Sequence, residues 1–226
     1  MLNLLRGTWA LFFGVGMIML ANGLQGSLIG VRASLEGYTA FAAGFIMTGY
    51  YAGFLSGALI IPQRIKNVGH VRTFAALASI ASISILLHSL HVSFFGWFLM
   101  RFITGMCFVG MYTVAESWIN DLSENNNRGQ ALSVYMMVSM AGSAFGQLFL
   151  NIASPETATL FMLVSILISV SLVPILVVVS KQPDFSISEF LTIKELYNTS
   201  PLGVTAAVLT GLAHGTLWGI GSLYAL

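Results

Sequence analysis

Two ionisable residues share one face of an apolar segment near the middle of the chain. At 100° per residue, five positions of this segment fall within roughly 80° of one another on a helix. They are Arg101, Gly105, Phe108, Tyr112 and Glu116. A charge at the centre of a bilayer costs about 2.5–3.5 kcal/mol, so such residues usually face a bundle interior or a watery cavity. The pattern predicts a helix with one polar, functional stripe.

Arg101 and Glu116 need separate partners, because fifteen residues of helix place them about 22 Å apart. For Arg101 we expect a position in a cavity; the alternative is that its long side chain reaches the lipid headgroups. For Glu116 we expect a carboxylate near the membrane surface that pairs with Arg72 or Arg128. Such a contact must break when helices separate, so it is a candidate gate.

Metal and thiol chemistry find little support in the sequence. His88 and His91 share a face, but no Asp, Glu or Cys lies beside them, so we interpret them as an ordinary interfacial pair. Cys107 is the single cysteine and has no partner for a disulfide, and we expect it to pack in the core. We therefore predict no metal site and no cofactor.

The composition indicates an integral membrane protein, with 57% hydrophobic residues, 8% charged residues and a mean hydropathy of +0.87. Continuous apolar runs favour helices, since barrel strands would alternate over about ten residues. The expected spans are Trp9–Ile29, Phe41–Ile61, Phe74–Leu90, Phe94–Ala115, Ala131–Ile152, Ala158–Val179 and Leu202–Leu226.

The distribution of basic residues predicts a cytoplasmic N-terminus. Seven of the nine lysines and arginines occupy the N-terminus and every second loop after it: Arg6, Arg64, Lys66, Arg72, Arg128, Lys181 and Lys194. The other set of loops holds only Arg32, and Arg101 lies inside a span.

A polar segment with two prolines separates the sixth and seventh spans and suggests a domain boundary. We predict a six-helix bundle over residues 1–180, a cytoplasmic linker over 181–200 and a seventh helix over 201–226. Within the linker, Ile187–Tyr197 could form a short helix on the membrane surface.

Two stripes of small residues mark close approaches between helices, which small side chains permit in lipid. The stripes are Gly49, Gly53 and Gly57 in the second span and Gly142 and Gly146 in the fifth. They either pack helices generally or meet helices of a second bundle outside the first six spans.

Several motifs together resemble the major facilitator superfamily and, within it, the YcaD-like group of bacterial inner-membrane transporters. Arg64-Ile-Lys-Asn-Val-Gly-His-Val-Arg72 is similar to the loop signature between helices two and three, and Arg101 with Gly105 to the RxxxG signature of helix four. The narrower resemblance rests on Glu116-Ser117, Asn127-Arg128-Gly129, Tyr135-Met-Met-Val138 and Gly142 to Gly146-Gln147. The chain corresponds to the first six helices and the seventh helix of a 12-helix fold.

The loop signature departs from the family pattern at its acidic position. If Gly69 is the central glycine, Lys66 replaces the usual Asp, Asn67 the usual Arg and Pro62 the leading Gly. Gly69 can still make the tight turn and Arg72 still supplies a cation. Glu116 and Arg128 are then the available substitutes for the gating contact.

The resemblance implies a secondary transporter in which two six-helix bundles rock about a central site. Family helices one, four and seven line that site, and the implied contacts are Asn22, Gln25, Arg101, Phe108, Tyr112, His214 and Trp218. We expect a small-molecule substrate and coupling to protons, carried by His214 or Glu116. The expected partners are the lipid bilayer and a C-terminal bundle, without nucleic acid.

Other classes of protein fit less well. A seven-helix receptor or retinal protein conflicts with the cytoplasmic N-terminus and with a seventh span that lacks lysine. An enzyme would need clustered ionisable groups, which are scattered singly here. An inactive or oligomerising half-transporter remains an alternative, and neither the substrate nor the direction of transport follows from the sequence.

Overall fold

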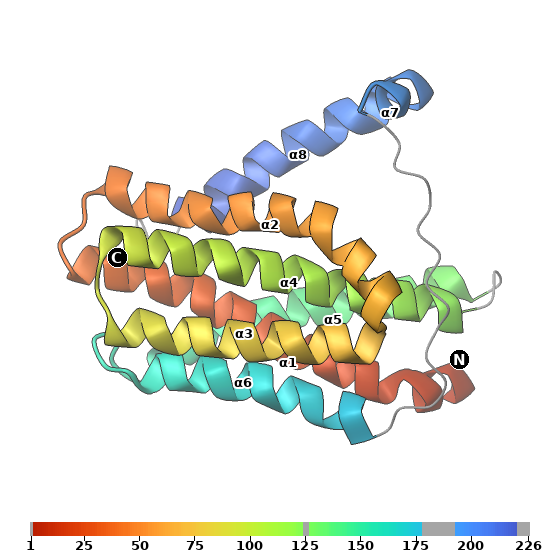
Figure 1. Ribbon diagram of the computed structural model, residues 1–226, viewed down its shortest axis with the longest axis horizontal. Helices are drawn as coiled ribbons and strands as arrows, with labels where there is room; N and C mark the ends of the chain where they lie inside the picture. The colour runs from red at the N-terminus through yellow and green to blue at the C-terminus, as the bar shows by residue number, and fades with distance from the viewer. Residues whose placement is uncertain (1, 124–126, 178–192, 221–226) are drawn as a thin grey trace.

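The computed structural model describes the backbone of residues 2–123, 127–177 and 193–220, and these residues form helices without any strand. The helices are α1 (Leu2–Leu35), α2 (Ala40–Val68), α3 (His70–Leu90), α4 (Phe94–Leu122), α5 (Arg128–Leu148), the 3₁₀ turn Phe149–Asn151, α6 (Thr159–Val177), α7 (Ile193–Thr199) and α8 (Pro201–Ile220) (Figure 1). Helices α1 to α6 are each long and apolar enough to cross a membrane, which confirms the first six expected spans. That α8 also crosses it stays a prediction.

The connection between α2 and α3 is shorter than the sequence suggested. We expected a loop over Arg64–Arg72, but α2 continues to Val68 and α3 begins at His70. Gly69 alone joins them, with a φ of +92° that favours glycine, and its N–H donates to the Ile65 carbonyl at 2.8 Å. A helix can continue through polar residues beyond the apolar span, because its backbone hydrogen bonds form within the helix itself.

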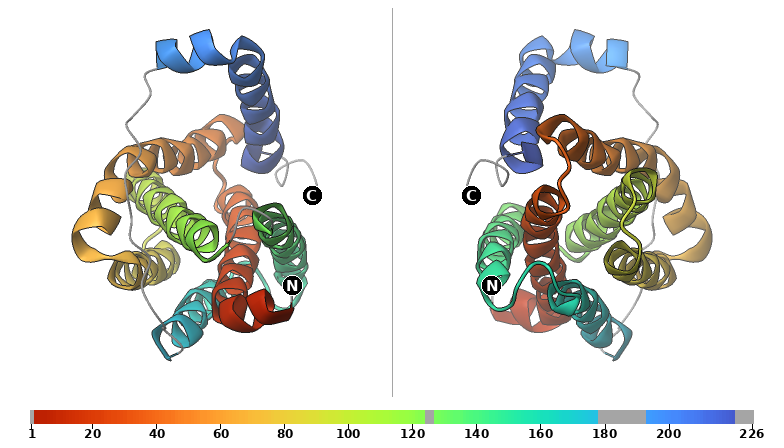
Figure 2. Two further views of the ribbon diagram at one scale, coloured as in Figure 1. Left: turned by 90° about the vertical axis from the view of Figure 1, so that its right-hand side faces the viewer. Right: turned by 90° about the vertical axis from the view of Figure 1, so that its left-hand side faces the viewer.

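The six long helices pack with an internal symmetry. Helix α2 packs on α4 as α5 packs on α1, and α6 packs on α1 as α3 packs on α4, while α3 and α6 pack on each other (Figures 1 and 2). Exchanging α1 with α4, α2 with α5 and α3 with α6 leaves this set of pairs unchanged. The pattern is that of two inverted three-helix repeats.

The glycine stripes lie at the two symmetry-related contacts. A Cβ built on Gly49 would lie 2.7 Å from the Phe98 carbonyl oxygen of α4, and one on Gly53 would overlap the Phe102 carbonyl. Gly57 faces Met106 of the same helix. The second-span stripe therefore meets α4, inside the bundle.

The stripe of the fifth span meets α1 in the same way. A Cβ on Gly142 would lie 2.8 Å from the Met19 Cβ, and one on Gly146 would overlap the Leu20 carbonyl. The alternative that these faces are reserved for helices outside the first six spans is therefore wrong. Both stripes let neighbouring backbones approach within one bundle.

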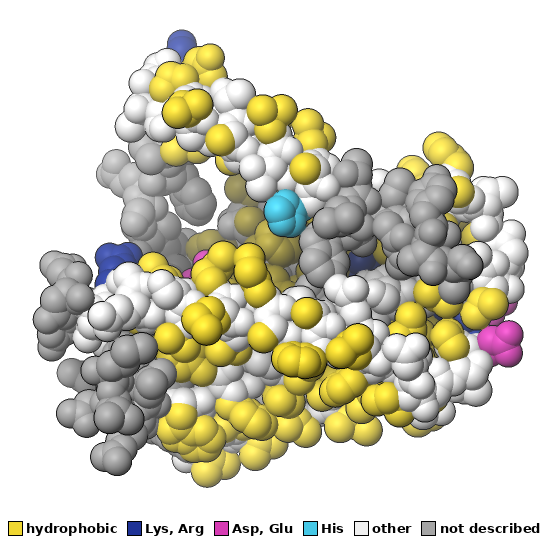
Figure 3. Space-filling view, turned by 180° about the vertical axis from the view of Figure 1, so that it is seen from behind, with side chains coloured by type: hydrophobic (Ala, Val, Ile, Leu, Met, Phe, Trp, Pro, Cys, Tyr) yellow, Lys and Arg dark blue, Asp and Glu magenta, His cyan; other side chains and the backbone are white. Residues whose placement is uncertain are grey.

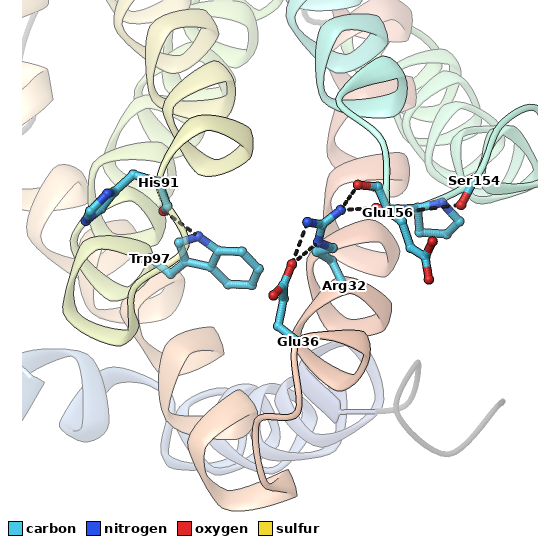
Figure 4. Close-up of polar contacts among 7 residues, drawn as sticks. Arg32, Glu36, His91, Trp97, Ser154 and Glu156 are labelled. Atoms are coloured by element: carbon cyan, nitrogen blue, oxygen red, sulfur yellow. Dashed lines mark hydrogen bonds and ion pairs between the residues drawn. The ribbon is translucent and has the colours of Figure 1, made fainter.

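One end of the bundle is fastened by Arg32 (Figure 4). Its Nε donates to Glu36 Oε1 at 2.7 Å, and its Nη1 donates to the carbonyl oxygens of Pro155 and Glu156. The α5–α6 connection is thereby held to the end of α1. Arg64, Lys66, Arg72 and Arg128 lie toward the opposite end, where α2 ends and α3 and α5 begin.

Helices α7 and α8 form an arm beside α2 (Figures 1 and 2). The short helix that we expected over Ile187–Tyr197 begins at Ile193 and continues to Thr199, and residues 187–192 lie outside the described residues. The division into bundle, linker and seventh helix remains a prediction.

Candidate binding cavity

A cavity of about 180 Å³ lies among four of the spanning helices. Its lining comes from α1, α2, α4 and α5: Asn22, Gly23, Gly26, Tyr50, Tyr51, Arg101 and Ser143. Glycine dominates the α1 side, and a Cβ on Gly26 would meet no described atom within 4 Å. The space therefore exists because small residues leave it open beside larger polar ones.

Arg101 is the cationic group of this cavity. Only 5% of the residue is exposed, and its guanidinium carbon lies 4.5 Å from the centre of the Tyr50 ring, a cation–π contact. Its Nε is buried without a hydrogen-bond partner, and no described carboxylate forms an ion pair with it. Of the two alternatives for Arg101, the structure therefore places it in the cavity rather than among headgroups.

Tyr50 links three helices around the cavity. Its hydroxyl donates to Asn22 Oδ1 at 3.3 Å, which joins α2 to α1, and its ring lies under the Arg101 guanidinium of α4. A tyrosine inside a span needs such a partner, because its hydroxyl loses water on burial. Tyr50 thus orients both the amide and the cation.

Phe108 and Tyr112 of the α4 stripe pack against aromatic side chains of α2. Phe108 is fully buried, with ring centres 6.3 Å from Tyr50 and 6.0 Å from Tyr112, and Tyr112 lies 6.3 Å from Phe54. Neither Phe108 nor Tyr112 lines the cavity. They form a cluster of tilted and edge-on aromatic rings that includes Tyr50, the ring that lies under the Arg101 guanidinium.

Two of the other expected contacts, Gln25 and His214, do not line the cavity. Gln25 is fully buried beside the cavity rather than in its lining, and neither of its amide atoms has a partner among the described residues. His214 is exposed on α8, with Nδ1 3.2 Å from the Thr210 carbonyl oxygen, and does not line the cavity. The side chain of Trp218 lies outside the described residues.

Comparison with known proteins assigns the chain to a family. The profile described as "Major Facilitator Superfamily" matches residues 11–226. The chain belongs to the major facilitator superfamily. It is a multi-pass membrane protein of a transporter family, which points away from enzymatic activity.

Curated relatives of this superfamily cover almost the whole chain. Proteins named "Uncharacterized MFS-type transporter YcaD" from Escherichia fergusonii, Escherichia coli (strain SE11) and Shigella sonnei are each 26% identical over 221 residues. These alignments include 97% of this chain and 58% of each relative. The chain therefore spans a little over half the length of the curated relatives that it matches.

The superfamily signature of helix four has two separate tasks in this chain. Arg101 lines the cavity, whereas Gly105 brings α4 against the backbone of α2, because a Cβ there would overlap the Tyr50 carbonyl. The close approach at Gly105 is what places the Tyr50 ring beneath the guanidinium. One residue supplies the charge and the other fixes its distance from an aromatic face.

The expected gating pairs are different in this member of the superfamily. Glu116 accepts a hydrogen bond from the Tyr135 hydroxyl of α5 at 2.9 Å, and it forms no ion pair with Arg72 or Arg128. Arg128 Nε instead donates to Asn120 Oδ1 at 2.8 Å. The expected ion pairs are therefore wrong: the partner of the Glu116 carboxylate is the Tyr135 hydroxyl on the neighbouring helix.

His88 and Cys107 are buried in the core, whereas His91 is exposed at the end of α3. His88 is fully buried, with Nδ1 2.8 Å from the Ser84 carbonyl oxygen and its ring beside Trp97. His91 ends α3, and its carbonyl accepts from Trp97 Nε1 at 3.0 Å (Figure 4). Cys107 is buried and free. Over the described part of the chain, no three His, Cys, Asp or Glu residues come together as metal ligands.

Sequence reasoning missed five residues of the cavity lining: Gly23, Gly26, Tyr50, Tyr51 and Ser143. The tyrosines had a usable signal, because two adjacent phenols about ten residues into an apolar helix need polar partners. Gly23, Gly26 and Ser143 had none, since small residues in spans usually serve packing.

Proposed function

We propose that this chain forms the first bundle of a secondary active transporter, which moves a small solute by alternating access. The observation that carries the proposal is Arg101, a buried cation without an ion-pair partner in the described structure that lines a polar cavity between spanning helices. Ionisable groups at such positions mark substrate or ion pathways. Membership in a transporter family supports the same conclusion.

Alternating access requires a second bundle. In this proposal residues 181–200 form a cytoplasmic linker and α8 begins the C-terminal bundle, the partner whose movement opens the cavity to either side. The relatives, of which this chain covers 58%, are long enough to contain such a bundle. In this proposal transport is therefore assayed with the second bundle present.

We further propose that the protein lies in the bacterial inner membrane with its N-terminus in the cytoplasm. Arg64, Lys66, Arg72 and Arg128 gather at one end of the bundle, and positive residues favour the cytoplasmic side. Arg32 at the other end is neutralised by Glu36.

A cysteine introduced at Gly26 should be labelled from both sides of the membrane. Cys107 is the single cysteine, so Cys107→Ala gives a clean background. Membrane-impermeant maleimide is applied to right-side-out and inside-out vesicles carrying Gly26→Cys. Alternating access exposes the cavity to each side in turn, so both preparations should react, in proportions that shift with an imposed pH gradient.

The exposed Asn67 near the end of α2 supplies the control for sidedness. Asn67→Cys should react only in inside-out vesicles, and reaction in right-side-out vesicles would reverse the proposed orientation. Labelling of Gly26→Cys from one side under every condition would contradict alternating access.

Proton coupling, the finer part of the proposal, places a titrating group at Glu116 or His214. The Glu116→Gln, His214→Gln double variant should lose the pH dependence of uptake, because neither residue can then carry a proton. Uptake is followed in vesicles between pH 5.5 and 8. The matched control is Glu195→Gln with His91→Gln, which removes one exposed carboxylate and one imidazole away from the cavity. An unchanged pH profile in the test variant would remove both residues from the coupling mechanism.

A further inference from the structure

The polar cavity adjoins an apolar groove, and Tyr51 belongs to both. The groove has a volume of about 790 Å³ and lies between α2 and α8. Tyr51 is 37% exposed and stands edge-on to Tyr50, with ring centres 5.6 Å apart. A molecule that reaches past Tyr51 would therefore touch a polar, cationic site at one end and a hydrocarbon surface at the other.

The polar end offers hydrogen-bond donors to a ligand. Asn22 Oδ1 already accepts from the Tyr50 hydroxyl, so the amide NH₂ of Asn22 is left as a donor. Arg101 has donors only, and no carboxylate among the described residues lines the cavity. A cationic ligand or a ligand group that mainly donates hydrogen bonds would find few acceptors here. A carboxylate, which only accepts hydrogen bonds, matches the donors of Asn22 and Arg101.

Arg101 also lacks a counter-charge within the described structure. Glu36 pairs with Arg32. Glu116 lies about 22 Å from Arg101 along α4 by the helical rise, and it accepts a hydrogen bond from Tyr135. Burying a guanidinium without an opposite charge is unfavourable, and a carboxylate can bind it through two parallel hydrogen bonds. The site is thus electrostatically complete only with an anion bound.

The apolar end is lined by hydrophobic side chains, which do not offer hydrogen bonds to a polar ligand group. On α2, Phe41 and Leu55 are 83% and 70% exposed, and on α8, Leu212 is 65% exposed. Gly211 and Gly215 also line the groove, and a Cβ on either would meet no described atom within 4 Å. Figure 3 shows hydrophobic side chains along the α8 arm and on the bundle beside it. The groove therefore has room for a hydrocarbon chain.

We propose that the site binds an amphipathic organic anion, with its carboxylate at Arg101 and its hydrocarbon body passing Tyr51 into the groove between α2 and α8. The proposal names the substrate class of the cavity and rests on the transport function proposed above. It commits to a free single-chain carboxylate; a phospholipid or a further protein helix in the groove are outcomes that the test separates.

Charge and chain length of the ligand test the two ends separately. The full chain is reconstituted in phosphatidylcholine nanodiscs, and binding is measured by calorimetry with empty discs subtracted. Octanoate should bind at least about tenfold more tightly than octanamide or octylammonium, because only the anion pairs with Arg101. From butyrate to octanoate the affinity should rise about fourfold per methylene that enters the groove.

Substitutions test which residues bind the carboxylate and which bind the hydrocarbon chain. Arg101→Gln should remove the preference for octanoate over octanamide, and Arg101→Lys should keep part of it. Gly211→Leu should fill the groove, so octanoate binding falls to the level of butyrate, while butyrate binding is unchanged. Gly129→Leu, at the start of α5 where an added Cβ likewise meets open space, should change neither. If Arg101→Gln fails to fold, Gly26→Leu replaces it as the variant that blocks the polar end.

Three outcomes would overturn the proposal. Equal binding of octanoate and octanamide would mean partition into lipid. A chain-length series unaffected by Gly211→Leu would place the tail elsewhere or the groove under protein. Displacement of octanoate by phosphatidylglycerol, but not by decanoate, would identify a lipid site. Two-sided labelling of Gly26→Cys alongside any of these would leave the transport proposal standing with a different substrate.

Discussion

Replacing Arg101 with glutamine should abolish transport while leaving the bundle folded. In the described structure the guanidinium has an aromatic face under it but no ion pair and no hydrogen bond from Nε. Burial of a charge without an ion pair is costly, so we expect the substitution to cost the empty protein little more than the cation–π contact with Tyr50. A bound anion, by contrast, would lose its only cationic contact in the cavity lining.

The expected loss is large because a charged contact in a desolvated site is worth more than one at a surface. Removing one partner of such a pair costs about 2–5 kcal/mol, which corresponds to at least about a 30-fold drop in solute affinity. Uptake by vesicles and thermal unfolding in detergent are measured on the same preparations. Arg101→Lys, which keeps the charge but not the planar fork, should retain a fraction of the activity.

Full activity of Arg101→Gln would remove the cation from the mechanism and return it to a packing role. Loss of both uptake and thermal stability would mean that Arg101 holds the helices together. The prediction requires the two readouts to separate.

Replacing Gly53 with alanine should strongly destabilise the bundle. The added Cβ would overlap the Phe102 carbonyl, which belongs to a helix backbone and cannot rotate away. Separating α2 from α4 loosens the contact that also places Tyr50 against Arg101. Overpacking of this kind costs about 1–3 kcal/mol, and a backbone contact belongs at the upper end. Thermal unfolding followed by circular dichroism measures the loss.

Two other glycines make the comparison decisive. Gly26→Ala introduces the same methyl group into a spanning helix where no described atom lies within 4 Å, so stability should be unchanged or slightly higher. Gly146→Ala should behave like Gly53→Ala, because Gly146 occupies the equivalent contact between α5 and α1. Equal stability of all three variants would show that the close helix approaches are not needed.

The spans could be predicted because lipid partition is a local property of the chain. Six expected spans coincide with α1 to α6, but their ends were less predictable. Arg64–Val68 continues α2 rather than forming a loop, since charged residues at a membrane surface do not interrupt helical hydrogen bonds. Only Gly69, with its positive φ, marks the true turn.

The contacts at the inner end depended on neighbouring helices and were predicted incorrectly. Charge alone favoured an ion pair between Glu116 and Arg72 or Arg128. The packing of α5 on α4 instead brings the Tyr135 hydroxyl to 2.9 Å from Glu116. A tyrosine nineteen residues away in the sequence has no helical periodicity that relates it to that carboxylate.

The sequence by itself predicted seven apolar spans, of which the structure confirms six, and it determined which family the chain resembles and that Arg101 is its unusual charge. Hydropathy, motif order and a charge in an apolar run can all be read along the chain. Only the tertiary structure decided what surrounds that charge. Tyr50, Asn22 and Ser143 come from three other helices and line one cavity with Arg101, and the close glycine contacts between these helices have a geometry that no linear pattern encodes. The same packing joins the cationic cavity to the groove at Tyr51, since both spaces arise between helices.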